Sequence, residues 1–209
     1  MLRAAEFEKG GSLSPSLRER IRQAAAVAGK LSSFAGNHPS PSAVPSTSVS
    51  ALLDRLLGEE TAGRAAKLAP AQGVKVDYRS QTGLWSAAVE EALLRDALIE
   101  VLRNACEAMP ERGSLTVRAQ NARIENDPGL LSPGAYVEIS VKDTGEGIDP
   151  THMGRIFEPF YSTKPRDRWL GVGLAIAYGI VRGRGGDIRV ESRPGKGTQV
   201  TIIVPAARG

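Results

Sequence analysis

The chain has 209 residues, of which 41% are hydrophobic and 24% charged, with a formal net charge of +4, a composition typical of folded globular proteins. No apolar run reaches the roughly 20 residues that span a bilayer, and the first ten residues lack the apolar core of a secretory signal. A single cysteine, Cys106, excludes a disulfide framework, and the scattered arginines with only 5% aromatic residues do not indicate a nucleic-acid partner. We therefore expect a cytoplasmic protein without a membrane segment.

The N-terminal region carries one helical pattern followed by a linker. Apolar residues between Leu17 and Leu31 alternate at spacings of four and three, which is the seam of a packed helix pair. This spacing predicts a helix over residues 15–34. The following stretch, residues 39–48, is rich in serine and proline and is typical of a linker. We place a domain boundary near residue 47, which gives regions 1–47 and 48–209.

The second region alternates helical and strand patterns. In chain order we expect a helix from Val49 to about Leu68, a strand at 74–78, a helix at 93–109 ended by Pro110, strands at 115–119 and 136–141, a helix at 174–181, and strands at 187–192 and 199–204 joined by a turn at 194–197. Helices layered on a mixed sheet form an α/β sandwich of two layers.

Two glycine pairs suggest a nucleotide, but the common nucleotide loops do not fit. Neither Gly145 and Gly147 nor Gly171 and Gly173 are followed by a third glycine at the spacing of a dinucleotide-binding loop. Lys196 is not followed by the Ser or Thr that a Walker loop requires. Both readings are excluded.

Four other motifs occur in order in the second region. They are Glu100 and Asn104 four residues apart on one helix, Asp143 to Ile148 (DTGEGI) after a strand, Ile156 to Lys164 (IFEPFYSTK) followed by Gly171 to Leu174 (GVGL), and Gly195 to Thr198 (GKGT). Over residues 48–205 this set resembles the ATP-binding catalytic domain of sensor histidine kinases, within the wider ATPase family shared with gyrase, heat-shock protein 90 and mismatch-repair proteins. The resemblance implies a Bergerat-type ATP-binding fold.

The chemistry of these residue types suits ATP. A carboxylate at Asp143 accepts a hydrogen bond from the adenine amino group, and glycines at 145 and 147 let the purine approach closely. The amide oxygen of Asn104 suits Mg²⁺, and the helix that begins after Gly173 offers free amide groups to phosphate. By resemblance, the ATP contacts are expected at Asn104, Glu107, Asp143, Gly145, Gly147, Ile148, Phe157, Lys164, Gly171, Val172, Gly173, Leu174 and Thr198, with ATP and Mg²⁺ as cofactors.

Glu100 departs from the sensor kinases, most of which have asparagine at this position. In ATP-hydrolysing relatives and serine-directed kinases of the family, a glutamate here acts as general base. We expect Glu100, Asn104 and Lys164 to be the catalytic residues, with Asn104 and Glu100 as the metal-binding residues. The alternative is that Glu100 is a solvated partner of Arg103 or is simply tolerated at this position. Phe157 and Phe160 are expected to be structural, and Cys106 to be a small buried residue.

The chain contains two histidines, His38 and His152, and neither has the helical setting and acidic neighbour of a phosphoacceptor. The helix at 15–34 resembles the second helix of a dimerisation hairpin, which implies a homodimer. We therefore predict a histidine kinase catalytic domain that acts on a histidine outside this chain, with a response-regulator receiver domain as partner. The alternatives are a separate ATPase or Ser/Thr kinase with Glu100 as base, and a module that binds ATP without chemistry.

Overall fold

The computed structural model describes residues 45–57, 73–109, 111–127, 131–163 and 171–207. All of them belong to the second of the two units into which the chain divides, Ser40–Gly209. The predicted helix at 15–34, most of the predicted linker, and residues 58–68 of the helix expected to continue from Val49 lie outside the described residues. The domain boundary near residue 47 stays a prediction.

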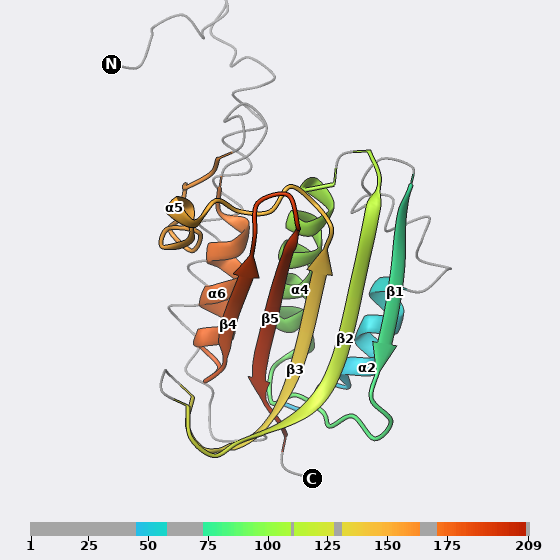
Figure 1. Ribbon diagram of the computed structural model, residues 1–209. Coiled ribbons are helices and arrows are strands. Elements are labelled where there is room, and N and C mark those ends of the chain that lie inside the picture. The colour runs from blue at the N-terminus through green and yellow to red at the C-terminus, as the bar shows by residue number, and fades with distance from the viewer. Residues whose placement is uncertain (1–44, 58–72, 110, 128–130, 164–170, 208–209) are drawn as a thin grey trace, which may run out of the picture. The chain divides into compact units, whose positions relative to one another are not determined.

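One mixed sheet of five strands forms the first layer (Figure 1). Its strands are β1 (Val74–Ser80), β2 (Gly113–Ile124), β3 (Gly134–Asp143), β4 (Asp187–Ser192) and β5 (Thr198–Pro205), in the spatial order β1-β2-β3-β5-β4. Strand β1 runs parallel to β2, whereas the other neighbours are antiparallel. The mixed sheet predicted from the alternating patterns is confirmed.

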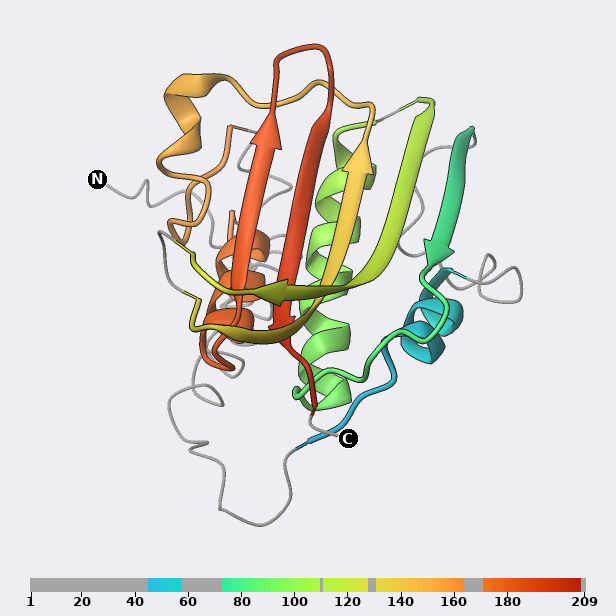
Figure 2. The same ribbon diagram turned by 60° about the horizontal axis from the view of Figure 1, so that its bottom comes forward.

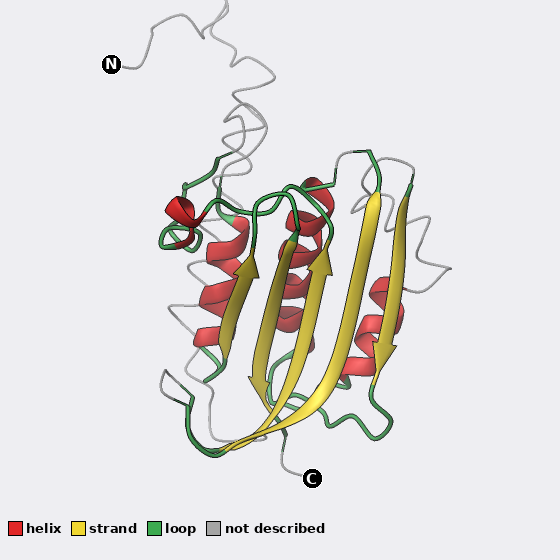
Figure 3. Cartoon of the chain, viewed as in Figure 1, coloured by secondary structure: helices red, strands yellow, loops and turns green. Residues whose placement is uncertain are grey.

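Among the described residues, three helices cover one face of this sheet: α2 (Val49–Leu57), α4 (Glu91–Glu107) and α6 (Gly173–Arg182) (Figures 1 and 3). A short helix, α5 (Pro150–Met153), follows β3 and was not expected. Asp149 precedes it as the N-cap, and its side chain accepts a hydrogen bond from the Thr151 amide at 2.9 Å. The arrangement is the predicted two-layer α/β sandwich. In the described part of the chain, no helix combines the length and hydropathy needed to cross a bilayer.

The core lies between the sheet and the helices because the strands alternate in burial. The inward residues of β3 and β5 include Val137, Ile139, Ile202 and Val204, which are almost completely buried. They are covered by the apolar faces of α4 and α6, with buried residues Leu94, Ala97, Leu98, Val101, Leu102, Ile176, Ala177, Ile180 and Val181. Each buried Leu or Ile contributes about 1.5–3 kcal/mol.

The opposite face of the sheet has a smaller apolar cluster where the long β2–β3 hairpin bends across the sheet (Figure 2). Leu131, Tyr136 and Ile203 are buried there against Ala122 and Ile124. The Tyr136 hydroxyl donates to the Ser132 carbonyl at 2.8 Å, which closes the cluster. This cluster lies near the first residues of β3, at the opposite end of the strand from Asp143.

Candidate active site

The candidate site forms at one end of the sandwich, where two elements end and two others begin. Strand β3 ends at Asp143, β5 begins at Thr198, α4 ends at Glu107 and α6 begins at Gly173. In Figure 1 these four ends all lie toward the top of the view, at the same end of the sheet. The sequence motifs that are far apart in the chain are therefore brought together by the strand and helix directions.

Asp143 is the buried carboxylate of the site, with only 2% of its surface exposed. Its Oδ1 atom accepts a hydrogen bond from the Gly145 amide at 2.8 Å and another from the Thr198 amide at 3.1 Å. These two bonds fix the carboxylate between the turn that follows β3 and the start of β5. Asp143 and Thr198, both named as expected ATP contacts, therefore lie next to each other in the structure.

The glycines after Asp143 pack closely against other parts of the chain, and their expected contact with the purine stays a prediction. A Cβ at Gly145 would lie 2.5 Å from the Ala108 carbonyl oxygen at the end of α4. Gly147 has φ +72°, and its Cβ would collide with the Arg193 carbonyl. Both positions require glycine because the turn packs against its own protein, so close approach of a purine is not needed to explain them.

A hydroxyl cluster connects this turn to the start of β5. Ser192 Oγ accepts a hydrogen bond from the Ile148 amide at 2.8 Å, donates to the Gly197 carbonyl at 3.1 Å, and lies 2.8 Å from Thr198 Oγ1. The sequence analysis missed Ser192. The signal that reveals it is the strand register, in which Ser192 faces Thr198 across the β4–β5 hairpin.

The ends of α4 and α6 form the second half of the site. A Cβ at Gly173 would lie 2.8 Å from Glu100 Oε2, 3.1 Å from Arg103 Nη2 and 3.6 Å from Asn104 Nδ2. The first turn of α6 thus lies directly against these three side chains of α4. Val172, the residue before the helix, provides no side-chain cap for the amide groups of this turn. Amide groups at a helix N-terminus favour phosphate oxygens.

Glu100 is buried, with 5% of its surface exposed, and its Oε2 accepts a hydrogen bond from Arg103 Nη2. Arg103 Nε also lies 3.4 Å from Glu107 Oε1. The expected alternative of a solvated partner of Arg103 is half correct: the ion pair exists, but the carboxylate is not solvated. A buried carboxylate next to a helix N-terminus is a setting suited to catalysis as well as to structure.

The segment after α5 is held by aromatic contacts. Phe157 stacks on Tyr178 of α6 with a centroid distance of 4.4 Å, which supports its expected structural role. The Arg155 guanidinium lies 4.1 Å from the centre of the Tyr161 ring. Phe160 is not a core residue, because it is 63% exposed and has φ +65°.

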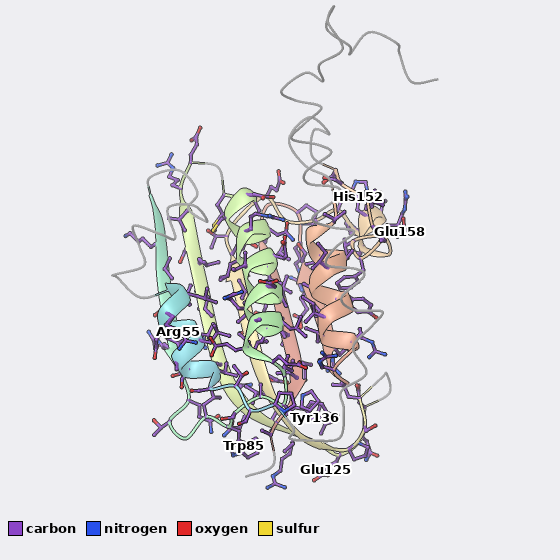
Figure 4. The ribbon with its side chains drawn as sticks, turned by 180° about the vertical axis from the view of Figure 1, so that it is seen from behind. Arg55, Trp85, Glu125, Tyr136, His152 and Glu158 are labelled. Carbon is purple, nitrogen blue, oxygen red and sulfur yellow. The ribbon has the colours of Figure 1, made fainter. Side chains whose placement is uncertain are left out.

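His152 is hydrogen-bonded within this segment, and its Nδ1 lies 2.6 Å from the Tyr161 hydroxyl. Figure 4 shows His152 and Glu158 on the same projection at the site end of the molecule. Gly171, with φ +65°, is close to the Tyr161 carbonyl, so the chain on either side of residues 164–170 comes together. Lys164 lies outside the described residues, so its expected phosphate contact stays a prediction.

The remaining expected ligand residues surround these groups. Val172 is buried, Ile148 and Leu174 are half-buried, and Glu107 is at the end of α4 beside Arg103. Cys106, one turn from the site, is buried as expected, and burial raises the pKa of its thiol to about 11, with smaller contributions from Glu107 and Asp143.

The residues present fit a magnesium ion that is held mainly by phosphates and water. Within the described ranges no three His, Cys, Asp or Glu side chains cluster as a metal site. Asn104 and Glu100 both lie against Gly173 and offer at most two side-chain ligands. One or two protein ligands are what Mg²⁺ requires when a nucleotide supplies the others.

Comparison with known proteins identifies this architecture. Residues 89–208 match the family described as histidine kinase-, DNA gyrase B- and HSP90-like ATPases. The chain belongs to this ATPase family, which confirms the resemblance seen in the motifs.

Within that family the sequence is similar to sensor kinases. It is 35% identical over 136 residues to the sensor kinase CckA of Brucella abortus, a match covering 63% of this chain and 14% of that protein. It is 38% identical over 112 residues to sporulation kinase E of Bacillus subtilis, covering 54% of this chain and 14% of that protein. The chain therefore spans about a seventh of these relatives.

A solved structure gives the same result for the fold. A mycobacterial sensor histidine kinase, MprB, superposes with a TM-score of 0.58 at 25% identity, covering 80% of this chain and all of that one. The chain carries an ATP-binding catalytic domain of the sensor histidine kinase type, and the α/β sandwich inferred from the sequence is confirmed.

Proposed function

We propose that this chain binds MgATP at the site described above and transfers its γ-phosphoryl group to a histidine of a two-component signalling system. The observation that carries the proposal is the meeting of the buried Asp143 with Thr198 on one side, and of Glu100 and Asn104 with the first turn of α6 on the other. The first pair suits a purine base and the second group suits phosphates. The similarity to named sensor kinases supports the same reaction.

The base is recognised by groups that the backbone holds in place. Asp143 Oδ1 is occupied by two backbone amides, so the orientation of the carboxylate is fixed before any ligand arrives. A carboxylate acts only as an acceptor and therefore prefers the amino group of adenine to the carbonyl of guanine. Such a preorganised pocket loses little conformational entropy on binding.

The phosphates lie toward the start of α6, where the free amides and the positive end of the helix favour negative charge. Asn104 would hold Mg²⁺ together with the phosphates, and Glu100 would lie in its outer surroundings. The ion supplies neutralisation of the charge that develops during phosphoryl transfer. Arg103, which is paired with Glu100, keeps that carboxylate oriented toward Gly173.

The acceptor is a histidine other than the two in this chain. His152 is engaged with Tyr161, whereas His38 lies outside the described residues and is followed by a proline. We further propose that the chain forms a homodimer through the region of residues 15–34, acts in the cytoplasm, and passes phosphate through the acceptor histidine to a response-regulator receiver domain. The one cysteine and the predicted seam helix support these points.

A second candidate function is ATP hydrolysis or transfer to a hydroxyl group, with Glu100 as general base. It is favoured by the burial of Glu100 beside the proposed phosphate site. A buried carboxylate there has the reach to orient a water or hydroxyl nucleophile. A nucleophilic imidazole needs this help less, so the two functions differ in their dependence on Glu100.

The experiment that tests this proposal measures nucleotide binding and nucleotide turnover on the same protein sample. Calorimetric titration with a non-hydrolysable ATP analogue and Mg²⁺, with the GTP analogue as control, is followed by a phosphate-release assay and by phosphotransfer to an added histidine-bearing hairpin domain. Adenine-selective binding with transfer to histidine that survives Glu100→Gln supports the kinase. Steady phosphate release abolished by Glu100→Gln supports the ATPase, binding with neither reaction indicates a binding module, and no binding refutes the proposal.

A further inference from the structure

Ser192 at the end of β4 has a hydroxyl group that joins three segments of the site. Its Oγ lies 2.8 Å from the Ile148 amide nitrogen, 3.1 Å from the Gly197 carbonyl oxygen and 2.8 Å from Thr198 Oγ1. Thr198 in turn contacts Asp143 through its own amide. Ser192 thus contacts Thr198, which in turn contacts the carboxylate proposed to bind the base. None of the sequence motifs includes Ser192.

The direction of each of these hydrogen bonds follows from counting protons. The Ile148 N–H group is only a donor, so Ser192 Oγ accepts from it. The Gly197 carbonyl is only an acceptor, so the single hydroxyl proton of Ser192 points to it. With that proton used, the third contact forms only if the Thr198 hydroxyl donates to Ser192. The opposite direction would leave the Gly197 carbonyl facing a lone pair of Ser192, with one hydrogen bond fewer.

We propose that Ser192 is a positioning residue that fixes the direction of the Thr198 hydroxyl and thereby the nucleobase preference of the site. Because the Thr198 proton is committed to Ser192, the Thr198 oxygen presents only lone pairs to its other neighbours. This inference rests on the proposed function, since it concerns the base of the nucleotide that the site would bind.

As a consequence, the Asp143 carboxylate and the Thr198 hydroxyl would both act as hydrogen-bond acceptors toward the base. Asp143 and Thr198 lie side by side on the face of the sheet that the helices cover. They belong to the adjacent strands β3 and β5, and Asp143 Oδ1 accepts a hydrogen bond from the Thr198 amide. A carboxylate beside an acceptor-only hydroxyl favours a base that offers hydrogen atoms, directly or through a water molecule. The 6-amino group of adenine offers them, whereas the 6-oxo group of hypoxanthine or guanine does not. An unfixed threonine hydroxyl would rotate to donate to the oxo group and weaken this selection.

Ser192 also holds the turn after β3, and this second effect must be separated from the first. Its bond to the Ile148 amide, together with the 2.7 Å bond from the Gly195 amide to the Glu146 carbonyl, attaches that turn to the β4–β5 hairpin. Loosening of the turn would weaken every nucleotide by a similar factor. Loss of the hydroxyl direction would weaken adenine nucleotides most, so a ratio of affinities distinguishes the two effects.

The experiment uses the full chain and three diphosphates that carry no γ-phosphoryl group: ADP, purine riboside diphosphate, which lacks the 6-amino group, and inosine diphosphate. Calorimetry gives Kd for each with the native chain and with Ser192→Ala. We expect the preference for ADP over purine riboside diphosphate to fall about five-fold in Ser192→Ala, with inosine diphosphate weakened less than ADP. Ser192→Thr is the matched control, because it keeps the hydroxyl, and its preference stays within about two-fold of the native value.

Thermal unfolding of each variant shows whether it folds. If Ser192→Ala does not fold, Ser192→Cys replaces it, because cysteine has nearly the shape of serine but is a weak donor and acceptor. The preference for ADP over purine riboside diphosphate should then fall by less than about five-fold. Equal weakening of all three nucleotides by Ser192→Ala would overturn the inference and leave Ser192 as a structural residue of the turn. Failure of the native chain to bind any of the three would refute the proposed function itself, a distinct result.

Discussion

Replacing Asp143 by asparagine separates the structural role of this side chain from its proposed role in binding. The carboxylate accepts two backbone amides on Oδ1, from Gly145 and Thr198. An asparagine keeps an amide oxygen in that position and places an NH₂ group where the second carboxylate oxygen was. The fold should therefore survive, whereas the acceptor facing the adenine amino group becomes a donor.

The magnitudes follow from these contacts. A hydrogen bond to a charged group contributes about 1.5–3 kcal/mol, so Asp143→Asn should weaken ADP about 10- to 150-fold. Its free energy of unfolding should change by less than about 1 kcal/mol, because both amides keep an acceptor. Asp143→Ala removes that acceptor from the buried Thr198 amide and the partly buried Gly145 amide, and should cost about 2–4 kcal/mol of stability.

The assay is calorimetric binding of ADP together with denaturant unfolding of the native chain and both variants. Nucleotide affinity that is unchanged in a folded Asp143→Asn chain would refute the assignment of this carboxylate to the base. Equal destabilisation by asparagine and alanine would refute the account of the two amide bonds.

Three further outcomes are expected. Asn104→Ala should remove the Mg²⁺-dependent part of nucleotide affinity, measured by titration with and without the metal, and a retained Mg²⁺ effect would contradict the metal assignment. Arg184→Met should cost about 1 kcal/mol at pH 7, because Arg184 forms bonds of 2.7 and 3.0 Å to the partly exposed Glu90 and lowers the pKa of that carboxyl. A carboxyl with a lowered pKa stabilises the fold above its ordinary value of 4.5, so this difference should shrink as the pH falls below 4.5 and toward the folded pKa, as denaturant unfolding at each pH would show. The Cys106 thiol, with a pKa of about 11, should be roughly 0.1% thiolate at pH 8, and its alkylation rate should rise about tenfold per pH unit up to pH 10; a plateau near pH 9 would contradict the burial.

The strands and helices were predictable wherever one face is apolar. The alternation of Val137, Ile139 and Val141 locates β3, and the apolar spacing in residues 93–102 locates α4, because burial on one side imposes these periods. The ends were less accurate. Strand β2 continues to Ile124, beyond the predicted 119, because the backbone ladder with β3 continues through polar residues such as Gln120 and Asn121. Ladder hydrogen bonds are independent of side-chain polarity, so the pattern does not reveal them.

The sequence named the residues of the candidate site but not their contacts with one another. The motifs assigned Asp143, Thr198, Asn104 and Gly173 to ATP binding, and the structure brings Asp143 next to Thr198 and Asn104 next to Gly173, while their contacts with ATP stay a prediction. Ser192 was missed because a serine in a strand carries no signal of its own, and its importance arises only from the pairing of two strands. Cross-strand neighbours depend on register, which a single sequence indicates weakly in polar positions.

The sequence also did not predict which charged groups are buried. The spacing of Glu100 and Arg103 on one helix suggests an ion pair, but both helices and the glycine at position 173 are needed to enclose the carboxylate. The neighbours that enclose Glu100 come from a distant part of the chain, so its burial could not be read from the sequence of α4 alone.

The two halves of the site rest on different kinds of structure, and this should appear in kinetics. The proposed base side is fixed by hydrogen bonds among β3, β5 and the turn at 145–148, so under the proposed function changes there would remove interactions present equally in the bound and reacting states. Such changes raise KM and leave kcat nearly constant. The proposed phosphate side lies where α4 and α6 meet at Gly173, beside Glu100 and Asn104, and its groups would act on charge that develops during transfer. Changes there should lower kcat, so the split between KM and kcat maps the boundary between the sheet half and the helix half of the site.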